Sequence, residues 1–280
     1  MKNIFDSLFV KRSPYSLAFF RIIITSYLLY FHQLVWDRLI YAIQSTSFQP
    51  IGIFKTLPHP ISVENLRFIY FAWILFLFFV FIGFASRYTT AILFFLSLIV
   101  LGYSSNFGKV VHDTHMILMS LLVLAVSRHA DVLSLDSVLY EKRKEKSWHY
   151  GWPLRFLQIY VVVSLTTLGM QKILQQGLVW AFSDKFYLTV YTHPSSGLLH
   201  EWFIGLPIWV SMLAAASALL VFELFSPLAL FYPFNCVYPF FWSAMHVGVT
   251  LLFGGHKMFF SQIAVYFCFL NFENLSKRWK

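Results

Sequence analysis

Charged side chains are scarce in this sequence of 280 residues. Asp, Glu, Lys and Arg make up 12% of the chain, against 59% hydrophobic residues, and the mean hydropathy is +0.67. Soluble domains carry about 25% charged residues. The composition therefore excludes a water-soluble fold and indicates an integral membrane protein.

Acidic residues, cysteines and grouped histidines are also few. The net charge of +9 is typical of nucleic-acid binding, but the basic residues lie between apolar runs, where they face lipid head groups and cytosol. We expect no nucleic-acid partner. Cys236 and Cys268 lie in apolar segments without a CxxC motif, which argues against thiol chemistry. The ten histidines contain one closely spaced pair, so no metal site is predicted.

Apolar runs of the length that crosses a bilayer dominate the sequence. They predict an all-α membrane protein, a multi-pass bundle of eight transmembrane helices near residues 15–36, 64–84, 88–106, 112–127, 153–175, 206–231, 235–253 and 257–271. The segment Glu223-Leu-Phe-Ser-Pro227 interrupts the sixth run and predicts a bent or broken helix. We expect one transmembrane domain over residues 1–280, with no separate soluble domain and the first helix retained as an anchor.

The basic residues of the loops predict the orientation. With the N-terminus in the cytoplasm, that side receives twelve Lys and Arg residues and the opposite side six. The basic run Glu141-Lys-Arg-Lys-Glu-Lys146 contributes most to this asymmetry. Both termini are therefore expected in the cytoplasm, with the protein in the plasma (inner) membrane.

Lys172 lies near the outer end of the fifth predicted helix. An ammonium in hydrocarbon costs about 2.5–3.5 kcal/mol, and a lysine held away from water can serve as a base. A lysine close to the interface can also extend its ammonium into water. Gln171 and its neighbouring glutamines suit either a watered cavity or an interface, so both readings stay open.

Histidines occur where two further helices are predicted. His112 and His115 are three residues apart, share a helix face and begin at the same outer membrane face as Lys172. They form either an interfacial cap or an acid/base or metal pair. His246 lies in the middle of the seventh helix, where a lone histidine usually bonds a neighbouring helix.

Two more charges lie inside apolar runs. Glu223 is far from either loop and needs a partner or a proton. Arg21 lies about two turns into the first helix. It can reach the cytoplasmic interface by snorkelling, which we favour, or pair with Glu223.

A string of segments runs through most of the chain in a specific order. It comprises Ser13-Pro-Tyr-Ser-Leu-Ala-Phe-Phe-Arg-Ile-Ile23, His115-Met-Ile-Leu-Met-Ser-Leu-Leu122, Leu133-Ser-Leu-Asp136, Trp152-Pro-Leu-Arg-Phe-Leu-Gln158, Gly169-Met-Gln-Lys172, Trp180, Glu223-Leu-Phe-Ser-Pro-Leu228 and His246. This order resembles the membrane part of the vitamin K-dependent γ-glutamyl carboxylase family, whose bacterial members are called HTTM (horizontally transferred transmembrane) proteins.

The resemblance implies a site at the outer face that binds a reduced quinone such as vitamin K hydroquinone. Lys172 would be the catalytic base and His115 its polar neighbour, in a carboxylase- or epoxidase-like enzyme. The substrate pocket would then include His112, His246, Glu223, Gln171 and Trp180.

Two departures from the family weaken the expectation of glutamate carboxylation. The carboxylases carry a large extramembrane region after their helices, which this sequence lacks, and Ser183 occupies the position of a family glycine. The size also resembles the sporulation-delaying SdpB proteins, which would imply maturation or export of a secreted peptide without catalysis by this chain. A third reading is a structural or transport-type protein, although no inverted repeat is visible. The partners expected are membrane lipid and either a quinone or a secreted peptide.

Overall fold

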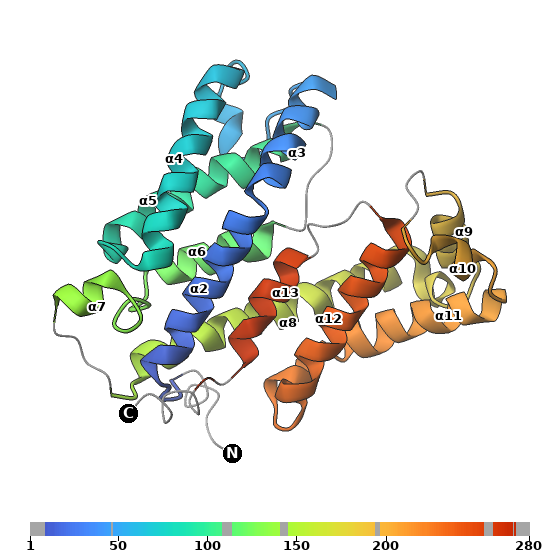
Figure 1. Cartoon of the computed structure of the whole chain (residues 1–280). Helices are drawn as coiled ribbons and strands as arrows, with labels where there is room; N and C mark the ends of the chain where they lie inside the picture. The colour runs from blue at the N-terminus through green and yellow to red at the C-terminus, as the bar shows by residue number, and fades with distance from the viewer. Residues whose placement is uncertain are drawn as a thin grey trace. The chain divides into compact units, whose positions relative to one another are not determined.

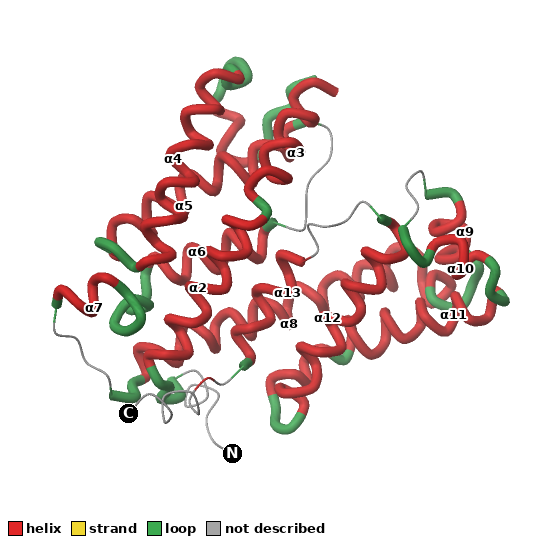
Figure 2. The backbone as a smooth tube through the Cα atoms, viewed as in Figure 1, coloured by secondary structure: helices red, strands yellow, loops and turns green. Residues whose placement is uncertain are grey.

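The described chain is helical throughout. The computed structural model describes residues 9–45, 47–107, 114–140, 145–193, 197–254, 260–270 and 272. In these ranges there is no β-strand, and an isolated antiparallel bridge joins Arg12 to Ser147 (Figures 1 and 2). The predicted all-α fold is confirmed.

Two compact units make up the chain. The first contains residues 1–157 and 271–280, and the second contains residues 158–270. Helix α8, Trp148–Gln176, contributes to both. A single transmembrane domain over residues 1–280 stays a prediction.

The first unit is a group of helices. They are α2 (Pro14–Tyr30), α3 (His32–Ser45), η1 (Gly52–Thr56), α4 (Val63–Ile82), α5 (Ser86–Gly102), η2 (Tyr103–Asn106), α6 (His115–Ala125) and α7 (Leu135–Leu139). Helix α4 packs between α2 and α5, and α5 packs on α6 (Figure 1). Ser13 and Ser62 cap α2 and α4 by accepting hydrogen bonds from the first backbone N–H groups.

The predicted first helix, 15–36, is broken in the structure. Helix α2 ends at Tyr30, and α3 leaves it at an angle of 55°. Phe31 lies in the break, with φ −98° and ψ 10°. Nδ1 of His32 lies 2.6 Å from the hydroxyl of Tyr70 on α4, which holds the start of α3 against that helix. No proline or glycine marks the break, so the sequence contains no local signal for it.

Arg21 neither snorkels nor pairs with Glu223. Its side chain is completely buried in the first unit. One guanidinium nitrogen donates to the carbonyl of His129 at 3.3 Å, and another donates to the carbonyl of Leu133. Two of its three nitrogens are bonded to backbone carbonyls because the turn between α6 and α7 folds over the side chain, while the buried Nε has no partner among the described residues.

Asp136 completes this buried cluster. Its carboxylate accepts hydrogen bonds from the backbone N–H groups of Ala85 and Ser86 at 2.8 and 2.9 Å. Gly83, in the left-handed region at φ +68°, ends α4. A Cβ there would lie 2.7 Å from a guanidinium nitrogen of Arg21, so only glycine fits. The cluster brings the segments Ser13–Ile23 and Leu133–Asp136 of the motif string together.

The second unit contains the remainder of α8 and a series of shorter elements. These are η3 (Gly177–Trp180), α9 (Lys185–Tyr191), α10 (His200–Ile204), α11 (Ile208–Ser217), η4 (Ala218–Leu224), η5 (Ser226–Leu230), α12 (Phe234–Phe253), α13 (Phe260–Tyr266) and η7 (Phe267–Phe269). The predicted interruption at Glu223–Pro227 is confirmed, since the helix passes from α11 into the π-helical η4 and then into the 3-10 turn η5.

Several helices meet the requirements for crossing a membrane. Four of those described are long and apolar enough, namely Val63–Ile82, Ser86–Asn106, Trp148–Val179 and Phe234–Phe253, and the bent pair α2–α3 can form a fifth span. The apolar helices His115–Ala125 and Ile208–Leu224 are shorter. These spans are compatible with a membrane protein, while eight spans and cytoplasmic termini stay predictions.

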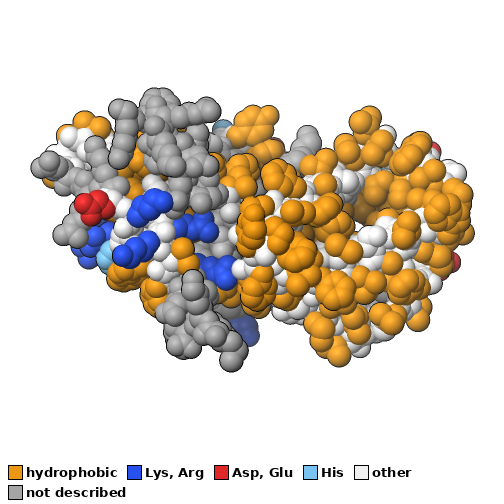
Figure 3. Space-filling model, turned by 90° about the horizontal axis from the view of Figure 1, so that it is seen from below, with side chains coloured by type: hydrophobic (Ala, Val, Ile, Leu, Met, Phe, Trp, Pro, Cys, Tyr) orange, Lys and Arg blue, Asp and Glu red, His pale blue; other side chains and the backbone are white. Residues whose placement is uncertain are grey.

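The surface agrees with this assignment. Figure 3 shows hydrophobic side chains over most of the face in view, with Lys and Arg side chains gathered in one area. Large apolar side chains are exposed on the candidate spans, including Phe68 at 75% on α4 and Phe95 at 64% on α5. An exposed apolar surface on this scale is typical of contact with lipid.

Candidate functional site

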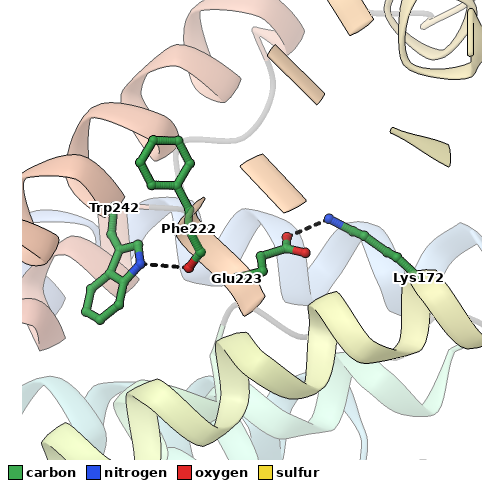
Figure 4. A network of polar contacts seen from close by, with 4 residues as sticks. All are labelled: Lys172, Phe222, Glu223 and Trp242. Carbon is green, nitrogen blue, oxygen red and sulfur yellow. Dashed lines mark hydrogen bonds and ion pairs between the residues drawn. The ribbon is translucent and has the colours of Figure 1, made fainter. Parts of the chain in front are cut away.

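An ion pair joins α8 to η4 in the second unit. Nζ of Lys172 lies 2.5 Å from Oε1 of Glu223 (Figure 4). The Glu223 side chain is 8% exposed and that of Lys172 is 30% exposed. The Glu223 side chain is therefore enclosed, while the Lys172 side chain is partly exposed. The sequence predicts that Glu223 needs a partner, and that partner is Lys172.

A glycine allows the two elements to approach. Gly169 precedes Lys172 by about one helical turn on α8. A Cβ at this position would lie 2.9 Å from Cβ of Glu223 and 3.2 Å from a side-chain carbon of Leu224. A larger residue would force η4 away from α8, so Gly169 sets the separation at which Lys172 reaches Glu223.

Hydroxyl groups continue the contact one turn earlier on α8. The hydroxyls of Thr166 and Ser226 lie 2.8 Å apart, and Ser226 also donates to the carbonyl of Val162 at 3.2 Å. Ser226 is fully buried. These bonds fix the register of η5 against α8 and, through the short connection, hold Glu223 in place.

Glu223 itself lies on a π-helical turn. The N–H of Phe225 donates to the carbonyl of Leu220, five residues earlier, at 3.0 Å. Five residues after Phe222 comes Pro227, which has no N–H to donate. The indole Nε1 of Trp242 on α12 donates to the Phe222 carbonyl instead, at 2.9 Å (Figure 4). Single π-helical turns are frequent at functional sites.

His246 belongs to the same unit, one turn after Trp242 on α12. It is 5% exposed, and its Nε2 lies 2.8 Å from the hydroxyl of Tyr266 on α13. The Tyr266 hydroxyl donates to Oε1 of Gln262 at 3.3 Å, which leaves it to accept a hydrogen bond from Nε2 of His246. The lone histidine thus bonds a neighbouring helix, as expected for a single histidine in an apolar helix.

A small cavity of about 120 Å³ lies between α12 and α13. Pro239, Ser243 and Tyr266 line it together with apolar side chains. Because its lining is almost entirely apolar, it suits a hydrocarbon group rather than a charged one.

The remaining predicted site residues are distributed over both units. Gln171 is exposed on α8 beside Lys172. Trp180 ends η3, and its side chain is outside the described structure. His115 begins α6 in the first unit and is half-buried, so its proximity to Lys172 in the second unit stays a prediction. His112 lies outside the described residues.

Metal ligands are not grouped in the part of the chain that the structure describes. Within these ranges, no three His, Cys, Asp or Glu side chains are placed to hold one metal ion.

Three contributors to the site were not predicted from the sequence. Trp242 and Tyr266 appear in the sequence as two aromatic residues among many, and Ser226 as part of the interruption before Pro227. Pro227 signals only that a carbonyl about one turn earlier lacks its usual donor, and the π-helical register that makes this the Phe222 carbonyl has no signal in the sequence.

Comparisons with protein families, with curated proteins and with solved structures find no match to this chain. The resemblance to HTTM proteins therefore remains a prediction from the motif string.

Proposed function

We propose that this chain is a multi-pass membrane protein of the HTTM type that binds the polar head group of a quinone or related lipid at the Lys172–Glu223 pair. The observation that carries the proposal is the state of the Glu223 carboxylate. Oε1 is bound to Lys172, whereas the buried Oε2 has no hydrogen-bond partner within the described residues. The proposal includes eight spans, cytoplasmic termini and a location in the plasma membrane, as the loop charges favour.

An unsatisfied buried acceptor is energetically unfavourable. Leaving such a group without a hydrogen bond costs about 1–3 kcal/mol, and more when it is charged. A ligand hydroxyl that displaces the side chains covering Oε2 and donates to it would remove this penalty. The ammonium of Lys172 has three N–H donors and is partly accessible, so it can donate to a ligand oxygen as well. One acceptor and one donor side by side fit a head group that carries hydroxyl or carbonyl oxygens.

The pair can also hold and move a proton. With the proton on Nζ, the two groups form an ion pair. Transfer of a proton across this short contact would leave Lys172 as an amine and Glu223 as a carboxylic acid. Lys172 in the neutral state is the base that the resemblance implies, and Glu223 stores the proton.

A reduced quinone supplies acidic hydroxyl groups and two electrons when bound. The residues of this chain would bind its head at Lys172 and Glu223, and the apolar cavity beside Tyr266 is of a kind that accommodates hydrocarbon. Gly169 and Ser226 would act as positioning residues, because they hold η4 against α8.

The test is mass spectrometry of quinones and lipids that remain with the purified protein. We expect Lys172→Ala and Glu223→Gln each to lower the amount of a specific retained quinone or lipid about tenfold, the effect of losing a charge-assisted hydrogen bond. Lys185→Ala is the matched control, because Lys185 is an exposed lysine of the same unit. Equal retention in all four proteins would exclude the site.

A further inference from the structure

A second cavity lies in the first unit, between the start of α3 and the first half of α4. It measures about 240 Å³, and its lining includes His32, Gln33 and Trp36 of α3 and Arg67 and Tyr70 of α4. The 55° break at Phe31 turns α3 away from the line of α2, so these side chains face α4 at the bend. This cavity shares no residue with the Lys172–Glu223 site.

The cavity lies near one end of a candidate membrane span. Helix α4 begins at Val63 and has 20 residues, which corresponds to about 30 Å, the thickness of the hydrocarbon core. Arg67 is then about 6 Å along the helix and Ile74, the deepest lining residue, about 17 Å. Arg67 therefore begins about one helical turn inside the hydrocarbon boundary, from where its long side chain can extend to the head groups, and the inner end of the cavity lies in the hydrocarbon.

Arg67 is the cation of this cavity. Its guanidinium makes no hydrogen bond or ion pair with any residue in the described ranges, and its side chain is exposed. The other polar groups are already engaged, since His32 bonds Tyr70 at 2.6 Å and Gln33 donates to Asp37 at 2.8 Å. A guanidinium with five unused donors beside a cavity matches the geometry of a phosphate, which it can bind through two parallel bonds.

The aromatic rings that line the cavity favour contact with a flat group or with methylene groups. In a ligand whose phosphate binds Arg67, these would be the groups next to the phosphate. Trp36 and Tyr70 are in contact, with their ring centroids 4.7 Å apart and their planes tilted by 35°. Trp and Tyr are enriched at membrane interfaces, where an apolar body meets a polar edge. A glycerol backbone could lie against these rings while its phosphate reaches Arg67.

An apolar face of α4 continues from the cavity toward the middle of the span. Phe71, Leu75 and Phe78 are exposed at 60%, 50% and 50%, and their spacing places them on one side of the helix. Acyl chains that begin at the cavity can follow this face. The continuity with an apolar track favours a phospholipid over a free phosphate ion.

We propose that this cavity is a binding site for a glycerophospholipid, with the lipid phosphate held by Arg67 and the acyl chains along the Phe71–Phe78 face of α4. The site selects its ligand through the phosphate rather than through general contact with bilayer lipid.

The test uses native mass spectrometry of the full chain after delipidation and addition of defined lipids. We expect phosphatidylglycerol to remain bound and diacylglycerol with the same acyl chains, which lacks the phosphate, to dissociate. Arg67→Ala should lower phosphatidylglycerol retention about tenfold, and Arg67→Lys should lower it less, because lysine keeps the charge but loses the bidentate geometry.

Arg87→Ala is the matched control, since Arg87 is an exposed arginine at the start of α5 in the same unit, and it should retain phosphatidylglycerol like the wild type. Equal retention of phosphatidylglycerol by the Arg67→Ala variant, or equal binding of diacylglycerol, would show annular lipid only and overturn the proposal. Displacement of the lipid by millimolar inorganic phosphate would overturn it in favour of a soluble anion site. The Lys172→Ala variant should bind phosphatidylglycerol normally, so this result is independent of the quinone site.

Discussion

Each of the two units contains a basic side chain inside apolar helices, but the two side chains differ in their exposure and in their hydrogen-bond partners. Arg21 in the first unit is completely enclosed and donates to the carbonyls of His129 and Leu133. Lys172 in the second unit is 30% exposed and faces the carboxylate of Glu223. An enclosed cation bonded to the backbone can only hold structure together. A cation that is reachable, beside a carboxylate oxygen with no partner among the described residues, can also meet a ligand.

This difference assigns separate roles to two parts of the same motif string. The segment around Arg21 and the segment around Asp136 are bound to each other across Gly83. They stabilise the first unit. The segments around Gly169 and Glu223 are bound to each other in the second unit and expose part of a charge pair. The presence of a residue in the motif string therefore does not show whether that residue stabilises the fold or binds a ligand.

The largest effect is expected from removing Arg21. In Arg21→Met, the carbonyls of His129 and Leu133 lose buried charged donors, and Asp136 loses the attraction of a nearby cation. We expect a loss of about 3 kcal/mol or more in the free energy of unfolding. Thermal unfolding of the purified protein in detergent measures it. Arg87→Met, at an exposed site, should leave the midpoint unchanged.

If Arg21→Met unfolds at the wild-type temperature, the enclosed cation is not structural and the contrast between the two units fails. Arg21→Lys should fall between the two, because it keeps the charge and only part of the donor geometry.

The fold was predictable where a run of apolar residues decides it. Long runs identify α4, α5, α8 and α12, because length and hydropathy are properties of a segment alone. The break at Phe31 was not predictable. It depends on how α3 packs on α4 through His32 and Tyr70, and no proline or glycine announces it.

The sequence predicts which residues belong to the candidate site, but it does not predict which of them contact one another. Lys172, Glu223 and His246 stand out because polar groups are unfavourable in apolar runs. Which of them meet depends on the register between helices. That register is set by Gly169 and by the π-helical turn before Pro227, and neither carries a periodic signal in the sequence.

A smaller effect is expected at the glycine that sets the separation in the second unit. Gly169→Ala places a Cβ 2.9 Å from Cβ of Glu223, so η4 must move. We expect a loss of about 1–2 kcal/mol in the free energy of unfolding. Gly248→Ala on α12 is the matched control, because no atom lies within 4 Å of its Cβ position. Alanine there should stabilise the helix by about 0.5–1 kcal/mol.

The two glycine substitutions should therefore have opposite signs. A Gly169→Ala variant that is as stable as the wild type, or more stable, would mean that α8 and η4 are not in close contact, and that the Lys172–Glu223 distance is not set by Gly169.

The smallest effect is expected in the coupling between Lys172 and Glu223. Lys172→Met leaves an enclosed carboxylate without its cation, and Glu223→Met leaves an ammonium without its anion, whereas the double variant leaves neither. Breaking one side of a buried pair is worse than replacing both sides with apolar groups. We expect the double variant to be at least as stable as either single variant, with a coupling energy of about 1 kcal/mol, because Lys172 is partly exposed. The unfolding midpoints of the wild type, the two single variants and the double variant complete this double-mutant cycle.

Purely additive losses would mean that the two groups do not interact. A pair retained for stability would make the double variant the least stable of the four. A stable double variant that has lost its bound quinone or lipid would mean that Lys172 and Glu223 serve ligand binding and not stability. Arg21, by contrast, would serve stability alone.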